Sequence, residues 1–192
     1  MTCLGISRKR GTTHMEHLSQ ILHEATAAIC EEYFLLPIHG DAPVYRERVY
    51  CYELYHQMRL RWPGGSPYRL NGEVDKIAHP YFQGLEGGKR KPNLLVHQPG
   101  SGRYNHACIE VKSVVGLVGQ DITKDLKTLS LFRNQLGYER AILLIYGVRF
   151  DDTLTGRVQR WASKVMQLAP IEVWLHVEPS APAVLSCTLM PA

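Results

Sequence analysis

The sequence predicts an α/β fold in which a mixed central sheet is flanked by helices. Three observations support this class: helical segments in the first third of the chain, two strands joined by a turn at residues 98–102, and a continuous apolar run at residues 140–148. A run of this kind is typical of a strand that is buried on both faces. Such a strand needs helices on both sides of the sheet, which is the economical arrangement for this order of elements.

Two helices are expected before the sheet. Apolar residues recur over residues 14–35 at nearly the i, i+3, i+4, i+7 spacing of an amphipathic helix. Breaks at Pro37, Gly40 and Pro43 separate it from a second helix over residues 44–62, which is rich in aromatic and charged residues. Residues 1–13 carry Arg8-Lys9-Arg10 without a following apolar segment, so we expect a disordered leader and not a signal peptide.

The rest of the chain predicts the sheet and its remaining helices. Strands are expected at residues 68–78, 91–97 and 106–112 as a three-strand meander, then at 140–148 and 171–177. Helices are expected at residues 121–136, where Gly137 is a plausible C-terminal stop, and at 154–168. Residues 14–178 then form a single domain. Residues 179–192, with three prolines, are expected to be an irregular tail.

Composition sets broad limits on function. The 192 residues are 45% hydrophobic and 21% charged, which is ordinary for a globular domain. A net charge of +4 is compatible with a polyanionic partner without demonstrating one. The five cysteines form no C-x-x-C pair, which argues against a disulfide framework or a cysteine-zinc site and fits a reducing, cytoplasmic location. No apolar run approaches the ~20 residues of a membrane span, so no membrane partner is expected.

Glu110-Val111-Lys112 is the most informative motif. Side chains alternate across a strand, so Glu110 and Lys112 are expected on one face of the third strand. A carboxylate beside an amine, facing a polar residue of the neighbouring strand, is the arrangement that metal-assisted phosphodiester cleavage requires. Such a pair on an edge strand is also often a plain surface ion pair. The surrounding order of elements favours the functional interpretation.

That order, with Pro92-Asn93 on the second strand and Glu110-Val111-Lys112 on the third, resembles the PD-(D/E)XK nuclease superfamily and its restriction-endonuclease-like fold. The resemblance covers residues 44–148. It implies a Mg²⁺- or Mn²⁺-dependent endonuclease of the restriction, repair or anti-phage defence type, acting on DNA or RNA. It also implies Glu110 as a metal ligand, Val111 as a carbonyl ligand and Lys112 as the amine that positions water and offsets charge. Family nucleases often dimerise, so a homodimer or a larger defence or repair complex is an expected assembly.

Asn93 departs from the family pattern, which has an aspartate at this position. An amide oxygen can bind Mg²⁺ but brings no negative charge, so we expect a weak metal ligand and impaired catalysis. Three explanations remain open: an engineered Asp→Asn change, a natural loss of catalysis, or compensation by another acid. The intact Glu110-Val111-Lys112 favours an engineered or recent change. The alternative function is a non-catalytic module that binds nucleic acid or a partner and retains the nuclease fold.

Other residues complete the predicted site. Glu73 is the first compensating acid, as catalytic residue and metal ligand, and Asp75 lies two residues further along the same strand. On the preceding helix, Glu47 and Glu53 are six residues apart and so about 240° apart, and at most one of them points at the site. Glu53, between Tyr52 and Leu54, is the preferred one. A basic rim of phosphate contacts is expected from Lys89, Arg90, Lys91, Arg103, Lys124 and Lys127.

Overall fold

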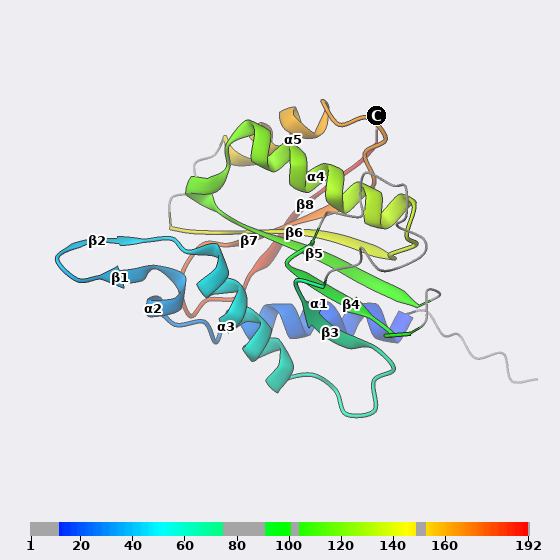
Figure 1. Ribbon diagram of the computed structural model, residues 1–192, viewed down its shortest axis with the longest axis horizontal. Coiled ribbons are helices and arrows are strands. Elements are labelled where there is room, and N and C mark those ends of the chain that lie inside the picture. The colour runs from blue at the N-terminus through cyan, green and yellow to red at the C-terminus, as the bar shows by residue number, and fades with distance from the viewer. Residues whose placement is uncertain (1–11, 75–90, 101–103, 149–152, 192) are drawn as a thin grey trace, which may run out of the picture.

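A six-stranded mixed sheet forms the centre of the protein (Figure 1). The computed structural model describes residues 12–74, 91–100, 104–148 and 153–191. The strands lie side by side in chain order: β3 (Arg69–Gly72), β4 (Leu94–His97), β5 (Asn105–Ser113), β6 (Arg140–Tyr146), β7 (Ile171–His176) and β8 (Val184–Leu189). Strands β3, β4 and β5 form an antiparallel meander, β5, β6 and β7 are parallel, and β8 is antiparallel to β7.

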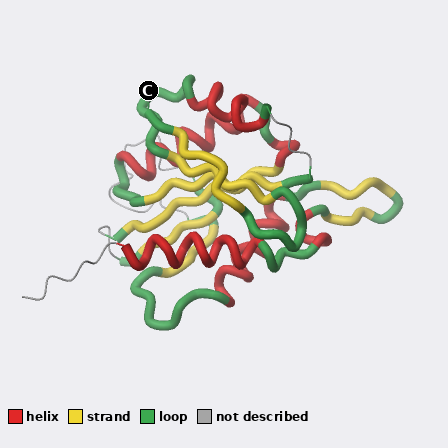
Figure 2. Tube along the Cα trace, turned by 180° about the vertical axis from the view of Figure 1, so that it is seen from behind, coloured by secondary structure: helices red, strands yellow, loops and turns green. Residues whose placement is uncertain are grey.

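Helices cover both faces of the sheet and give a three-layer structure (Figures 1 and 2). On one face lie α1 (Thr12–Thr26) and α3 (Glu47–Leu60), and on the other lie α4 (Gly119–Asn134) and α5 (Leu154–Ala162). Each face has its own apolar core because the strand side chains alternate. Ile109 and Val111 of β5 pack toward α1 and α3, whereas Cys108 packs toward α4 and α5.

Strand β6 shows why the apolar run at residues 140–148 predicts a central strand. All seven of its residues are buried, and it pairs in parallel with β5 on one side and β7 on the other. A parallel strand between two neighbours has both faces covered by helices, so an apolar side chain is favoured at every position. The predicted α/β class with a mixed sheet is therefore confirmed.

A small β-hairpin that was not predicted precedes α3. The expected helix over residues 14–35 is two helices, α1 and the short α2 (Glu31–Phe34). The chain then forms β1 (Leu36–Ile38) and β2 (Asp41–Val44), a two-stranded antiparallel pair that extends away from the main sheet (Figure 2). Gly40, with φ +73°, makes the turn that the breaks at residues 37–43 indicate.

The expected irregular tail is wrong, because residues 184–189 form β8 and complete the sheet beside β7. The strand has six residues, and its apolar and polar side chains do not alternate regularly. Its sequence between Pro182 and Pro191 therefore gives only a weak indication of a strand. The domain boundary expected at residue 178 therefore falls inside the sheet. The leader expected at residues 1–13 lies outside the described residues except for Thr12 and Thr13, which begin α1. No described helix has the length and apolar character needed to cross a membrane.

Candidate active site

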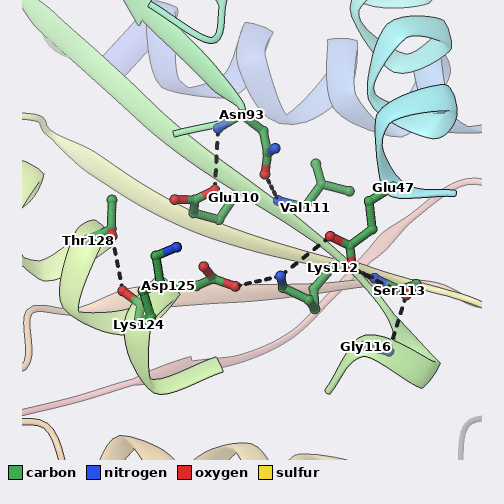
Figure 3. Close-up of polar contacts among 10 residues, drawn as sticks. All are labelled: Glu47, Asn93, Glu110, Val111, Lys112, Ser113, Gly116, Lys124, Asp125 and Thr128. Carbon is green, nitrogen blue, oxygen red and sulfur yellow. Dashed lines mark hydrogen bonds and ion pairs between the residues drawn. The ribbon is translucent and has the colours of Figure 1, made fainter. Parts of the chain in front are cut away.

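The candidate site is built where β5 continues beyond its neighbour β4. Leu94, the first residue of β4, pairs with Ile109, whereas β5 runs on to Ser113. The peptide N–H groups on that side of β5 then have no strand to bond. Side chains replace it: the N–H of Val111 donates to Asn93 Oδ1 at 2.7 Å, and the N–H of Ser113 donates to Glu47 Oε1 at 3.1 Å (Figure 3). The end of β5 therefore fixes Asn93 and Glu47 beside it.

Asn93 is engaged in the sheet through three groups. Besides its side-chain oxygen, its N–H donates to Glu110 Oε2 at 3.3 Å, and its carbonyl accepts from the N–H of Glu73 at 3.1 Å. Because Val111 offers a donor, the oxygen of the Asn93 amide must face it. The amide oxygen that was expected to bind metal is therefore already used by the backbone. The carbonyl of Val111 points to the same side of β5 as its N–H, because the N–H and C=O groups of one strand residue both point toward the same neighbouring strand.

Glu110 is the buried acid of the site. Only 7% of the residue is exposed, and it lies on the α4 side of β5. Burial, followed by the negative charge of Asp125, raises the pKa of its carboxyl to about 8, against the lowering effects of the Asn93 N–H and of Lys112. Without a compensating cation, Glu110 therefore holds its proton at neutral pH.

Lys112 lies between two carboxylates, on the same side as Glu110 (Figure 3). Its Nζ is 3.0 Å from Asp125 Oδ2 and 3.4 Å from Glu47 Oε2. Burial alone would lower its pKa, but the charges of Asp125 and Glu47 outweigh burial and raise it above the ordinary lysine value. Lys112 is thus held as an ammonium, so its chemistry is to offset negative charge and to donate hydrogen bonds.

Asp125 is a site residue that sequence reasoning missed. It lies on α4 three residues after Ile122 and four before Leu129, which places it on the buried stripe of that helix. Burial raises its pKa, and Lys112 lowers it by a smaller amount. The signal was present in the sequence, because a carboxylate on an inward stripe must face the sheet.

The helix acid of the site is Glu47, and the preference for Glu53 is wrong. Glu47 stands in the first turn of α3, where the helix begins beside the end of β5. Its Oε1 also accepts from the hydroxyl of Ser113 at 3.2 Å. Glu53 instead accepts from Gln57 on its own helix at 2.7 Å. The expectation that at most one of the two acids points at the site agrees with this placement.

Gly116 permits the close approach of Glu47. It ends the 3₁₀ turn Val114–Gly116, and its N–H donates to the hydroxyl of Ser113 at 3.2 Å. A Cβ at this position would lie 2.7 Å from Glu47 Oε1 and 3.0 Å from Ser113 Oγ. A side chain there would displace the carboxylate that holds Ser113 and Lys112.

Glu73 is not joined to this group by a side-chain contact. It follows β3 with a left-handed φ of 44°, and its carboxylate lies 3.6 Å from the guanidinium of Arg48. Half of its side chain is exposed. The role of metal ligand expected for Glu73 is therefore not supported by this placement, although its backbone adjoins Asn93.

The predicted basic rim is only partly described. Lys124 and Lys127 lie exposed on α4, and Lys124 is near enough to Glu110 to lower the pKa of that carboxyl. Lys91 is exposed just before Pro92. Asp75, Lys89, Arg90 and Arg103 lie outside the described residues.

Among the described side chains, no group of three or more His, Cys, Asp or Glu is arranged to hold a metal ion. The site instead brings together two acids facing one region, Glu110 and Asp125, with Lys112 and Glu47 beside them (Figure 3). Comparison with protein-family models, curated proteins and solved structures finds no match to this chain.

Proposed function

We propose that this chain is a Mg²⁺-dependent endonuclease that hydrolyses phosphodiester bonds of DNA, with a restriction-endonuclease-like fold. The observation that carries the proposal is the position of Lys112 between Glu47 and Asp125, beside the buried Glu110, at the open end of β5. A fixed ammonium beside acids is suited to a reaction that builds negative charge on a phosphate.

The order of elements supports the same proposal. Helix α3, the meander β3–β4–β5, helix α4 and strand β6 follow one another as in the PD-(D/E)XK resemblance. Pro92-Asn93 directly precedes the second strand of the meander, and Glu110-Val111-Lys112 lies near the end of the third. The motif and the order of elements therefore agree with each other.

The donor set fits a hard divalent cation. Glu110 and Asp125 are buried carboxyls with raised pKa values, and the repulsion of Glu110 by Asp125 is relieved by positive charge. Mg²⁺ in enzymes that act on phosphates usually takes only one or two carboxylates, together with waters and substrate oxygens. We therefore assign Glu110 and Asp125 as its ligands in this chain, in place of Glu73, while the neutral Asn93 withholds the negative charge that an aspartate at its position would add to the site. A bound Mg²⁺ would supply positive charge at the scissile phosphate and make a water molecule more acidic.

The chain's own residues have distinct tasks in this reaction. Lys112 keeps its proton and offsets the charge that develops on the phosphate oxygens as water attacks phosphorus and the P–O bond to the leaving oxygen breaks. Glu47 is a positioning residue, because it holds both the Lys112 ammonium and the Ser113 backbone. The exposed Lys124 and Lys127 bind the backbone phosphates without reading sequence.

Plasmid nicking tests the proposal. The chain or its Asn93→Asp variant should nick supercoiled plasmid in Mg²⁺ and stop in EDTA, and Lys112→Ala should lower the rate at least about 100-fold. Lys164→Ala, at an exposed lysine of the loop after α5, is the matched control and should retain the rate. Absence of nicking by both the chain and its Asn93→Asp variant would exclude the proposal.

A non-catalytic module that binds nucleic acid is the second candidate, and one observation favours it. The Asn93 oxygen is bonded to the Val111 N–H and brings no charge, so the position of the usual aspartate contributes no anionic ligand. This candidate predicts DNA binding that weakens steeply with salt and no cleavage in any metal. Lys124→Ala and Lys127→Ala should each reduce the slope of the logarithm of the binding constant against the logarithm of the salt concentration by about one, because each removes one phosphate contact.

The proposed cellular location is a reducing compartment such as the cytoplasm. None of the described cysteines, which are Cys30, Cys51, Cys108 and Cys187, forms a disulfide. Cys51 and Cys108 lie inside the two cores as small apolar side chains. This pattern supports the location without bearing on the enzymatic activity.

A further inference from the structure

A pocket lies away from the candidate active site. This cavity of about 200 Å³ is partly open to solvent and is lined by residues of α1, of the loop that joins α3 to β3, and of β4 and β5. His106, near the start of β5, lines this cavity, whereas Lys112 lies near the other end of the same strand. The cavity is therefore separate from the group formed by Glu110, Lys112 and Asp125.

A β-bulge brings His106 to this cavity. Val96 pairs with Ala107 and His97 pairs with Asn105, so the register skips His106. A bulge of this kind turns one side chain away from the regular alternation and is common beside functional sites. With regular alternation, His106 would lie on the same face of the sheet as Cys108, which is the face toward α4 and α5. Because of the bulge, His106 instead lines the cavity next to Val96 and α1 on the opposite face.

The orientation of the His106 ring is set from outside the cavity. Its Nδ1 lies 2.8 Å from Glu139 Oε2, just before β6. Because a carboxylate only accepts, Nδ1 carries the proton of this bond. The ring of Tyr68 lies beside His106, with centroids 5.1 Å apart and an angle of 39° between the planes. His106 is thus a fixed polar wall and not a mobile surface side chain.

Aromatic and apolar groups form the rest of the lining. The indole N–H of Trp62 donates to the carbonyl of Tyr68 at 3.1 Å, which ties the two aromatic residues together across the loop. Leu18, Ile21 and Val96 add apolar surface. No Asp, Glu, Lys or Arg is among the lining residues in the described part of the chain. The lining therefore suits a ligand without formal charge.

We propose that this cavity binds one neutral planar heterocycle, of the size and chemistry of a nucleobase. An apolar cavity of about 150 Å³ is enough for benzene, and larger drug-like ligands occupy about 300 Å³ or more. A volume near 200 Å³ therefore matches a ring system of one or two rings. Tyr68 and Trp62 are aromatic residues of the lining, and aromatic side chains can stack on any nucleobase. The proposal is independent of whether the chain cleaves DNA.

Nuclear magnetic resonance of the ¹⁵N-labelled chain tests the binding directly. Titration with adenosine, guanosine, cytidine and thymidine should shift the backbone amides of Gly64, Gly65, Ser66, Tyr68 and His106, and the shifts should saturate for at least one nucleoside. This measurement needs no variant, so it does not depend on whether a substitution folds. Absence of saturable shifts for all four nucleosides at millimolar concentration, or shifts that lie elsewhere, would overturn the proposal.

Calorimetry with variants tests whether Tyr68 contacts the bound base and whether that base comes from a nucleic-acid strand or from a free nucleoside. Tyr68→Ala should weaken nucleoside binding about tenfold or more. Tyr52→Ala, at a tyrosine of α3 that is 63% exposed and does not line the cavity, should leave it unchanged. If the base comes from a nucleic-acid strand, Tyr68→Ala should also bind single-stranded DNA more weakly than the unmodified chain does. The affinity for an abasic strand should then be the same for the two proteins. If it is a free nucleoside, the affinity for DNA should be the same in both proteins. Nucleoside binding that is unchanged in folded Tyr68→Ala would contradict the proposal.

Discussion

At the scale of single residues, Glu110 is a buried acid whose pKa is raised by its surroundings. A carboxyl that is buried beside another acid holds its proton to a higher pH than it does in the unfolded chain, where its pKa is near 4.5. The folded state therefore binds one more proton than the unfolded state between pH 4.5 and about 8. The stability that this proton provides is fully present below the unfolded value and is lost as the pH rises through the folded value.

Glu110→Gln should remove this pH dependence. In EDTA, the free energy of unfolding of the unmodified chain should fall between pH 6 and pH 8 by up to about 1.4 kcal/mol per pH unit, and that of Glu110→Gln should fall much less. Urea unfolding at pH 6, 7 and 8 measures the free energy of unfolding of both proteins. The contributions of the other titrating groups cancel when the two values at each pH are subtracted. Parallel curves for the two proteins would show that the pKa of Glu110 is close to its ordinary value.

Gly116→Ala tests the contact between Gly116 and Glu47. An alanine here has no backbone strain to overcome, since Gly116 does not adopt a positive φ, but its Cβ would meet Glu47 Oε1 at 2.7 Å. We expect the variant to lose about 1 kcal/mol or more of unfolding free energy, because Glu47 must leave Ser113. Gly156→Ala on α5, where nothing lies within 4 Å, is the control and should gain about 0.5–1 kcal/mol. A gain in both variants would show that Glu47 moves without cost.

At the scale of elements, a buried ion pair fastens α1 to the sheet. Arg140, at the start of β6, donates to both carboxylate oxygens of Glu172 on β7 at 2.8 and 2.6 Å and to Ser19 of α1 at 3.0 Å. Burial would raise the pKa of Glu172, but the bonds and charge of Arg140 outweigh burial and lower it. The pair thus joins two strands and one helix.

Glu172→Gln should destabilise the protein strongly, because it removes the carboxylate that forms an ion pair with the buried Arg140. We expect a loss on the order of 3 kcal/mol in urea unfolding at pH 7. Glu178→Gln, at an exposed glutamate in the loop after β7, is the matched control and should change stability by less than about 0.5 kcal/mol. An equal effect of the two substitutions on the free energy of unfolding would mean that water solvates the charge of Arg140 as well as the Glu172 carboxylate does.

The elements also show what sequence can and cannot predict. The apolar run of β6 and the alternation of β5 are local patterns, so the central strand and the shared face of Glu110 and Lys112 followed from them. Asp125 could have been found in the same way, from its place on the inward stripe of α4. Glu47 could not, because the turn of α3 that meets the end of β5 depends on how that helix packs on the sheet. Strand β8 was missed because it is held mainly by pairing with β7, a contact distant from its own sequence signal.

At the scale of the whole molecule, the two layers of helices meet the candidate site from opposite sides. Glu47 comes from α3 on one face and Asp125 from α4 on the other, and both reach Lys112 at the end of β5 (Figure 3). The site therefore exists only in the assembled three-layer fold. A cation held by Glu110 and Asp125 should in turn stabilise that fold, because ligands that bind only the folded state favour it.

Mg²⁺ should raise the melting temperature of the chain. At a concentration 100 times the dissociation constant, the expected gain is about 2.7 kcal/mol. Glu110→Gln and Asp125→Asn should lose this gain, while Asp41→Asn, at an exposed acid in the β1–β2 hairpin, should retain it. Scanning calorimetry at matched ionic strength measures the shift. The same shift in all the variants would place the cation elsewhere.

We propose that Glu110, Lys112 and Asp125 form one phosphodiesterase site that lacks the charge of an aspartate at position 93. The rate of plasmid nicking by Asn93→Asp in Mg²⁺ tests this most directly. We expect cleavage that exceeds that of the unmodified chain and that falls at least about 100-fold when either Lys112→Ala or Asp125→Asn is added. No cleavage by Asn93→Asp, or cleavage that does not depend on Asp125 and Lys112, would show that these residues do not form a phosphodiesterase site.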